Sequence, residues 1–196
     1  SSIKKRIFDI LMSFIGFFIL FPLFVIFYPF FIIIAKRPII FKQKRMGKNK
    51  KSFTIYKIRT MKAGSEKKRN KLEEINIAPY PMFKAKNDPR FHAFGKTLSK
   101  FGIDEFPQLL NILKGEMSFV GPRPLPVNEA RLLDSSWDFR YKVKPGILSE
   151  WALSKNRYKS LKNWKKLEKE TIKNESVKNN ILLIFRALHQ IIIQQL

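Results

Sequence analysis

Two adjacent carboxylates, Asp104 and Glu105, are the residues best placed to do chemistry in this sequence. They stand just before Pro107, and proline is well accommodated only in the first turn of a helix. We therefore expect both carboxylates at a helix N-terminus, where unpaired N–H groups and the positive dipole favour carboxylates and also bind phosphate. The alternative is that Asp104 simply caps the helix.

A second candidate is Arg123, which follows Gly121 and lies between Pro122 and Pro124. Two prolines stiffen the backbone on either side, so the guanidinium is presented from a rigid loop. A fixed guanidinium suits bidentate contact with phosphate. An ordinary surface turn with a solvated arginine is the alternative.

Two further cations, Lys57 and Arg59, are spaced so that they share one face of a strand. This spacing could aim both charges at one phosphate group. Charged outward positions on an edge strand would give the same pattern.

The length and charge of the chain limit the possible partners. With 196 residues, the chain has room for an anchor and one compact domain. Its net charge of +24 indicates a polyanionic partner, which could be nucleic acid, an anionic lipid surface or a phosphate-rich small substrate. The absence of cysteine excludes disulfides and thiolate metal sites, and it fits a reducing compartment.

The N-terminal segment predicts a membrane anchor. No residue from Ile10 to Ala35 is charged, a run longer than the roughly 20 residues that span a bilayer as a helix. It is also longer than the core of a cleaved signal peptide. Basic residues flank both ends and favour the cytoplasmic side, so we expect residues 1–37 to form a re-entrant helix broken at Pro22. A kinked single-pass helix is the alternative.

Asp9 lies next to this apolar run, four residues after Lys5 and three after Arg6. These spacings bring side chains together on one helix face. A carboxylate that enters the membrane interface needs a partner, so we expect Asp9 to pair with one of the two cations. An interfacial cluster without a special role would have the same sequence.

Residues 38–196 predict a mainly α (α+β) cytoplasmic domain associated with the membrane interface. Two strand-like runs between residues 39 and 58 indicate a β-hairpin. An irregular region at 62–90 includes a short helix near 66–75, and the clearest helix covers 106–113. A Gly- and Pro-rich loop follows at 115–126. The Lys-rich and apolar segments near the C-terminus predict surface amphipathic helices that lie on the membrane or on the core.

The order of the motifs points to a family. The chain contains, in sequence, "KRIFD", "FKQKRMG", "YKIRTM", "NDPR", "DEFPQLLNILKGEMSFVGPRP" and "VKPGI". Over residues 4–157 it resembles the bacterial sugar transferase family, the small monotopic phosphoglycosyl transferases. The resemblance implies a re-entrant membrane helix and transfer of a sugar phosphate from a UDP-sugar to polyprenol phosphate, with release of UMP. It also implies a requirement for Mg²⁺, a location at the cytoplasmic face of the bacterial inner membrane, and a place at the first membrane step of glycoconjugate and polysaccharide assembly.

The resemblance also implies residue roles. Asp104 would be the nucleophile and a metal ligand, forming a sugar-phosphoryl aspartate. Glu105 would be its partner, helping to place the metal or to take the proton from the incoming polyprenol phosphate. A carboxylate that attacks a diphosphate needs its repulsion cancelled, and positive charge would come from Mg²⁺ and four basic residues: Lys57, Arg59, Arg90 and Arg123. Phe21 and Ser99 depart from the serine and arginine that are common in the family at those positions.

Two other classes of protein fit parts of the sequence. Lysines interleaved with aromatic residues are typical of a membrane-tethered nucleic-acid-binding protein. A Lys-rich surface also suits a lipid-binding scaffold. Neither class needs adjacent carboxylates beside a rigid Pro-Arg-Pro loop, so we expect a UDP-sugar, polyprenol phosphate and membrane lipids as partners, and no nucleic acid. The sequence leaves the sugar and the oligomeric state open.

Overall fold

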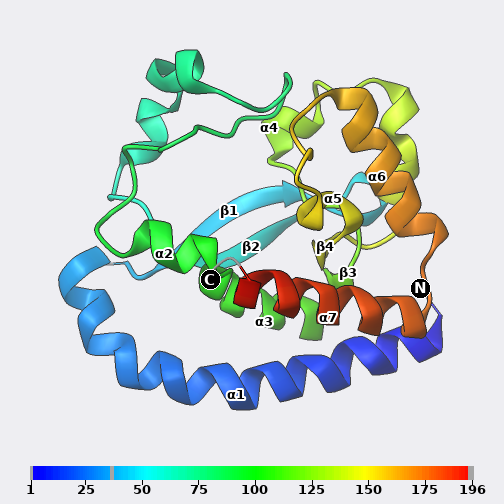
Figure 1. Ribbon diagram of the computed structural model, residues 1–196, viewed down its shortest axis with the longest axis horizontal. Coiled ribbons are helices and arrows are strands. Elements are labelled where there is room, and N and C mark those ends of the chain that lie inside the picture. The colour runs from blue at the N-terminus through cyan, green and yellow to red at the C-terminus, as the bar shows by residue number, and fades with distance from the viewer. Residues whose placement is uncertain (1, 36–37, 194–196) are drawn as a thin grey trace.

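The apolar N-terminal segment forms one helix, α1 (Ile3–Ala35), in the computed structural model, which describes residues 2–35 and 38–193. The helix continues through Pro22 and Pro29, so the predicted break at Pro22 is not present as an interruption. A proline removes one backbone hydrogen bond, and a helix can absorb this loss by bending rather than ending. Figure 1 shows α1 beneath the rest of the chain, with both of its ends turned towards it.

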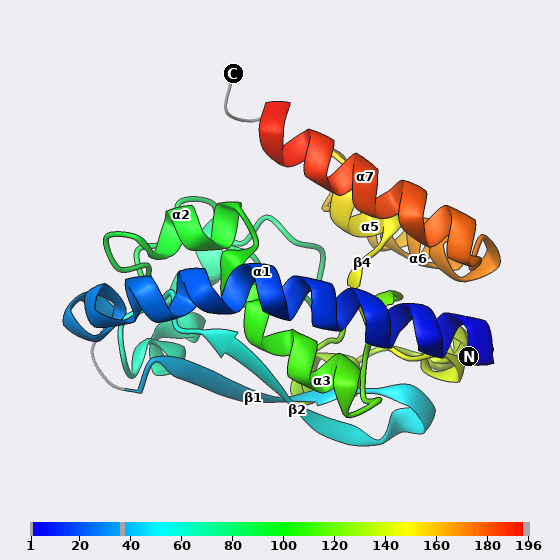
Figure 2. The same ribbon diagram turned by 90° about the horizontal axis from the view of Figure 1, so that it is seen from below.

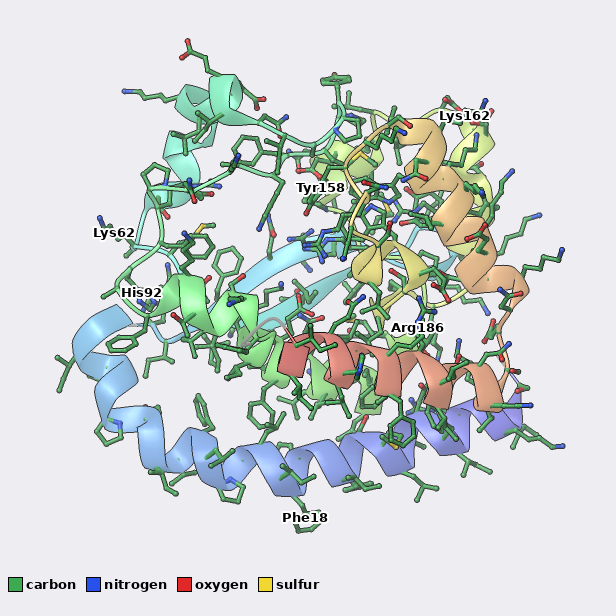
Figure 3. All side chains as sticks on the ribbon, viewed as in Figure 1. Phe18, Lys62, His92, Tyr158, Lys162 and Arg186 are labelled. Atoms are coloured by element: carbon green, nitrogen blue, oxygen red, sulfur yellow. The ribbon has the colours of Figure 1, made fainter. Side chains whose placement is uncertain are left out.

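The surface of α1 is apolar. The stretch Ile3–Ile26 is long and apolar enough to cross a membrane, with a mean hydropathy of 2.4, and little of it is buried within the protein. Large side chains such as Phe18 extend away from the rest of the chain (Figure 3). An exposed apolar surface of this size is costly in water, which suggests that the protein associates with a membrane.

The N-terminal end of α1 is attached to the rest of the chain by polar contacts. Asp9 is fully buried, and its Oδ1 accepts hydrogen bonds from Ser118 Oγ (2.9 Å) and from the backbone N–H of Phe119 (3.0 Å). Arg6 donates to the carbonyls of Ile112 and Leu113 (2.5 and 2.6 Å).

The predicted pairing of Asp9 with Lys5 or Arg6 is therefore wrong. Lys5 instead donates to the carbonyl of Val120 (3.0 Å) and pairs with Glu175 (2.5 Å). Carbonyls at the end of a helix lack partners within that helix, and those at the end of α3 accept from Arg6, whereas Lys5 is engaged by a carbonyl of β3 and by Glu175.

Two small sheets form the centre of the molecule. Strands β1 (Ile40–Met46) and β2 (Ser52–Ile58) are antiparallel, which confirms the predicted hairpin. Strands β3 (Ser118–Val120) and β4 (Gly146–Leu148) are parallel; β3 lies within the predicted loop at 115–126, and no strand was predicted at β4. A Cβ atom on Gly146 would lie 2.1 Å from the backbone nitrogen of Gly121, so the close approach of these segments requires glycine.

Short helices surround the sheets. They are η1 (Lys48–Lys50), η2 (Ser65–Ile75), α2 (Gly95–Lys100), η3 (Ile103–Gln108), α3 (Leu109–Leu113), α4 (Val127–Ala130), η4 (Ser135–Lys142), α5 (Glu150–Leu153), α6 (Leu161–Lys173) and α7 (Val177–Ile193). Here α denotes an α-helix and η a 3₁₀ helix. The fold is α+β, as predicted, and η2 agrees with the short helix expected near 66–75.

The core has two parts. One part contains Phe53, Phe106, Leu109 and Ile112, and residues of α1 such as Phe17 pack against it. The other contains three tryptophans, Trp137, Trp151 and Trp164, from η4, α5 and α6. The first part fixes α1 beneath β2 and η3, and the second fixes the C-terminal helices above them.

Helix α7 is amphipathic, as expected. Asn180, Leu183 and Ala187 are buried, whereas Phe185 and Ile192 are largely exposed. Figures 1 and 2 show α7 beginning beside the N-terminal end of α1 and diverging from it. One face of α7 therefore lies on the core, and the other adds to the exposed apolar surface.

Candidate active site

The two carboxylates lie in the first turn of η3. The residue before this turn is Gly102, whose φ of 70° is easily reached only without a side chain. Asp104 lies inside the turn and makes no capping hydrogen bond, so the alternative that it caps the helix is wrong. Both carboxylates line a cavity of about 400 Å³.

The cavity brings together the six charged residues that the sequence assigned to catalysis or substrate binding. Its lining includes Lys57, Arg59, Arg90, Asp104, Glu105 and Arg123. Lys57 is in β2, and Arg59 directly follows the end of that strand. The others come from the irregular region before α2, from η3 and from the loop after β3. Pro122 and Pro124 are buried behind Arg123 and do not line the cavity.

Lys57 distinguishes the two carboxylates. Its Nζ lies 2.7 Å from Glu105 Oε1 and 3.9 Å from Asp104 Oδ2. Burial raises the pKa of Asp104 to about 6, against the opposing charge of Lys57. Burial also acts to raise the pKa of Glu105, but Lys57 and Arg123 outweigh it and hold that pKa below its usual range. Glu105 is therefore a stable anion, and Asp104 is ionised less easily.

The loop that carries Arg123 is held from behind by a buried polar network. Arg140 donates a hydrogen bond to the carbonyl of Arg123 and lies 3.0 Å from Glu168 Oε1. Trp164 Nε1 donates to the same Glu168 oxygen at 2.8 Å. Arg140, Glu168 and Trp164 are almost completely buried, so the position of Arg123 depends on residues distant in sequence.

Arg123 also contacts an aromatic ring. Its guanidinium carbon lies 5.4 Å from the ring centroid of Trp151, within the range of a cation–π contact. The ring stacks on Trp164 at a centroid distance of 4.1 Å. The guanidinium is therefore supported by packing on one side.

Arg90 and Arg59 are already engaged. Arg90 donates hydrogen bonds from Nε and Nη2 to the carboxylate of Asp88, at distances of 2.6 to 3.1 Å. Burial acts to raise the pKa of Asp88, but the hydrogen bonds from Arg90 lower it further than burial raises it. Arg59 Nε donates to the carbonyl of Pro38 at 2.8 Å. Both arginines line the cavity, and their contacts hold them in position.

Sequence reasoning missed several residues of the cavity. These include Lys84, Glu129, Trp151, Arg157 and Tyr158. The stretch "WALSKNRY" at 151–158 has an aromatic residue at each end and two basic residues between them, a signal that could have indicated a binding segment. Ser99 lines the cavity, whereas Lys100 does not and lies over the ring of Phe101 at 5.7 Å.

The carboxylates fit a magnesium ion only in part. Among residues 2–35 and 38–193, no group of three or more His, Asp or Glu side chains could hold a metal ion. Mg²⁺ in phosphoryl-transfer sites is commonly bound by one or two carboxylates together with substrate phosphates and water. Asp104 and Glu105 meet this smaller requirement because they are adjacent and share the cavity with cations that suit phosphate.

Comparison with known proteins gives a consistent result. The family model described as "Bacterial sugar transferase" matches residues 1–194. The exopolysaccharide production protein ExoY of Sinorhizobium fredii is 31% identical over 190 residues, which cover 95% of this chain and 84% of that protein.

Two further relatives carry more specific names. The undecaprenyl-phosphate galactose phosphotransferase of Salmonella typhimurium is 32% identical over 191 residues, covering 95% of this chain and 40% of that protein. The UDP-galactose-lipid carrier transferase of Erwinia amylovora is 31% identical over 196 residues, covering 96% and 40%. This chain thus aligns along almost its whole length with part of each of these larger proteins.

Proposed function

The chain belongs to the bacterial sugar transferase family, and on this premise we propose that it transfers a sugar phosphate from a UDP-sugar to polyprenol phosphate. The products are a polyprenyl-diphosphate-sugar and UMP. This step would begin the assembly of a glycoconjugate or polysaccharide on a lipid carrier. The relatives' names, which refer to undecaprenyl phosphate, UDP-galactose and a lipid carrier, support this substrate class.

One observation carries the proposal. A buried carboxylate, Asp104, and its neighbour Glu105 share a cavity with Lys57 and Arg123, which come from distant parts of the sequence. A carboxylate surrounded by cations suits attack on a diphosphate, because the cations offset the repulsion between the two anions.

In the first step, Asp104 attacks the β-phosphorus of the UDP-sugar. A bond forms between the aspartate oxygen and this phosphorus, and the bond from phosphorus to the bridging oxygen breaks. The electron pair leaves with UMP, and a sugar-phosphoryl aspartate remains. Lys57 and Arg123 offset the charge on the transferring phosphoryl group.

In the second step, a phosphate oxygen of polyprenol phosphate attacks the same phosphorus. The bond from phosphorus to Asp104 breaks, and the carboxylate is restored. Glu105 remains an anion throughout, because a carboxyl group whose pKa lies below its usual range is a weak base at neutral pH. We therefore favour a role in metal placement over proton abstraction for Glu105.

We propose that Mg²⁺ is bound by Asp104, Glu105 and the donor phosphates. Bound there, the ion would supply positive charge to the diphosphate. Because two carboxylates alone bind Mg²⁺ weakly, the protein should take up the ion together with the nucleotide.

We also propose that the protein is monotopic and lies at the cytoplasmic face of the bacterial inner membrane. Basic residues at both ends of α1 favour the same side. The turn of both helix ends towards the rest of the chain in Figure 1 supports re-entry. The lipid acceptor would then stay in the membrane while the nucleotide enters from water.

The test is UMP release by purified full-length protein with Mg²⁺, undecaprenyl phosphate and a panel of UDP-sugars that begins with UDP-galactose. We expect release with at least one donor and none with Asp104→Asn. Sustained release by Asp104→Asn would exclude Asp104 as the nucleophile. Intact mass measured with donor and no acceptor should reveal an adduct of sugar plus phosphate on Asp104.

A further inference from the structure

Three cations of the cavity lack a carboxylate partner. Lys84, Arg123 and Arg157 line the cavity, and none forms an ion pair within the described part of the chain. The contrast with Lys57 and Arg90 is clear, since each of these is paired with a neighbouring carboxylate. In Figure 3, side-chain nitrogen atoms gather in the middle of the molecule, below the label of Tyr158.

Lys84 and Arg157 are held in place. The backbone N–H of Lys84 donates to Asn76 Oδ1 at 2.9 Å, and its carbonyl accepts from Ile77 N at 2.8 Å. Arg157 Nη1 donates to the carbonyl of Ala152 at 2.6 Å, and the carbonyl of Arg157 accepts from Trp151 Nε1 at 2.9 Å. The protein thus fixes two segments that bring like charges into one cavity.

This arrangement is unfavourable in the absence of an anion. Burial lowers the pKa of Lys84, the charges of Arg123, Arg157 and Lys57 lower it further, and the charge of Asp88 opposes them only in part. Like charges that share a partly buried site repel one another, and a bound anion turns the repulsion into attraction. The arrangement is therefore that of a preorganised phosphate site.

We propose that Lys84 and Arg157, together with Arg123, form a subsite for the phosphate of the leaving nucleotide, the α-phosphate of the donor. This inference rests on the proposed function. Negative charge develops on the leaving phosphate as its bond to the β-phosphorus breaks, so cations fixed there stabilise the transition state. Lys84 and Arg157 would act on the leaving group, and Lys57 on the carboxylates.

Aromatic residues favour a nucleotide over the lipid acceptor as the occupant. Tyr158 and Trp151 line the same cavity beside Arg157 and Arg123. Trp151 is almost fully buried and stacks on Trp164, so Tyr158 is the ring that a base can reach. The two rings contact each other edge to face, with centroids 5.6 Å apart. Aromatic faces next to cations are typical of sites that bind a base and a phosphate together.

The test compares UMP with uridine by titration calorimetry on the full chain in detergent. In the unmodified protein, UMP should bind more tightly than uridine because of its phosphate. Lys84→Met or Arg157→Met should weaken UMP about tenfold and leave uridine nearly unchanged, since a lost charge-assisted hydrogen bond has about this effect. Lys84→Arg should restore most of the binding. Lys155→Met, at an exposed position outside the cavity, is the matched control.

Other outcomes would overturn the subsite. If UMP affinity is unchanged in both Met variants, or if only the KM for undecaprenyl phosphate rises, the cations do not hold the leaving phosphate. Because uridine serves as an internal reference, a general folding defect would weaken both ligands and would also count against the proposal.

These measurements can reject the subsite without rejecting the proposed function, and the reverse. Loss of UMP affinity in Lys84→Met, without turnover of any UDP-sugar by the unmodified protein, would keep the subsite and reject the enzyme. Turnover by the unmodified protein, with normal UMP affinity in Lys84→Met, would keep the enzyme and reject the subsite.

Discussion

Lys57 Nζ lies 2.7 Å from Glu105 Oε1, closer than its 3.9 Å distance from Asp104 Oδ2. The single ammonium group therefore neutralises Glu105 first and affects Asp104 only from a distance. As a result, two adjacent carboxylates differ in their proton affinity. This difference allows one carboxylate to serve as nucleophile and its neighbour to remain a permanent anion.

The first prediction is a pH dependence of the initial step. Only ionised Asp104 can attack, and its pKa is raised to about 6. We expect kcat/KM for the donor to be nearly constant above about pH 7, half-maximal near pH 6 and about tenfold lower at pH 5. UMP release measured across this range checks the profile.

Lys57→Met provides the comparison for that profile. Removal of the ammonium should raise the pKa of Asp104, so the midpoint should move to higher pH and the rate at neutral pH should fall. A profile that keeps its midpoint in Lys57→Met would mean that a group other than Asp104 controls it.

The second prediction concerns stability. An acid whose pKa is higher in the folded than in the unfolded state binds protons more tightly when folded, so stability falls as pH rises from about 4 to above 6. For Asp104 the penalty at pH 7.5 is roughly 2–3 kcal/mol, at about 1.4 kcal/mol per pKa unit. Asp104→Asn should remove it.

Thermal unfolding in detergent measures this effect. The melting temperature of Asp104→Asn should exceed that of the unmodified protein at pH 7.5, and the difference should disappear near pH 4. If Asp104→Asn is less stable than the unmodified protein at pH 7.5, the buried charge of Asp104 does not destabilise the fold as predicted.

Much of the site was accessible from sequence because its chemistry is local. Asp104 and Glu105 are adjacent, and Pro107 correctly placed them in a first helical turn. The hairpin was predicted because its strands are adjacent in the chain and carry a clear alternation. What could not be predicted depends on contacts between distant segments. The parallel pairing of β3 with β4 and the approach of Lys84 to Arg157 have no local signal.

The contacts of α1 illustrate the same limit. Sequence spacing placed Asp9 within reach of Lys5 and Arg6, and spacing alone offered no other partner. In the folded chain, the end of α3 and strand β3 present backbone and hydroxyl groups that bind all three side chains, through Oδ1 alone in the case of Asp9. The helix is continuous through Pro22, so re-entry and the role of Pro22 in it remain predictions.

The third prediction concerns the network behind Arg123. Arg140→Met should leave Glu168 as an unpaired buried charge and free the carbonyl of Arg123, which should cost about 3–5 kcal/mol of stability. Combining Arg140→Met with Glu168→Met removes both charges, so the double variant should be more stable than the sum of the single effects predicts.

Activity separates the support of Arg123 from general packing. The double variant should recover stability but retain a raised KM for the donor, because the Arg123 carbonyl still lacks its hydrogen bond. Full recovery of the donor KM in the double variant would show that the network does not position Arg123.

The fourth prediction tests how Asp9 acts. Its Oδ1 accepts two hydrogen bonds from β3, and an asparagine can keep one oxygen acceptor in the same place. We expect Asp9→Asn to cost little, and Asp9→Ala to cost about 2–4 kcal/mol because it leaves two buried donors unpaired. Melting temperatures of the two variants in detergent give the comparison. Equal losses in both would indicate that the charge of Asp9, rather than its acceptor role, is required.

The fifth prediction is that both ends of α1 lie on the same side of the membrane. The protein contains no cysteine, so Ser2→Cys and Pro38→Cys each provide a single label site without further changes. Basic residues near both positions resist translocation, and both ends of α1 turn towards the rest of the chain in Figure 1. A membrane-impermeant maleimide should therefore label both sites in inside-out vesicles and neither in intact spheroplasts.

Pro22 should be required for this arrangement. Without it, the helix gains a backbone hydrogen bond and loses a cause of bending, so Pro22→Ala should favour a straight helix that spans the bilayer. In that variant, the site at residue 38 should become accessible on the opposite side from residue 2. Pro29→Ala is the matched control, because it makes the same substitution closer to the end of the helix. Opposite-side labelling in the protein that retains both prolines would mean that α1 spans the membrane, and same-side labelling in Pro22→Ala would mean that the flanking charges suffice without Pro22.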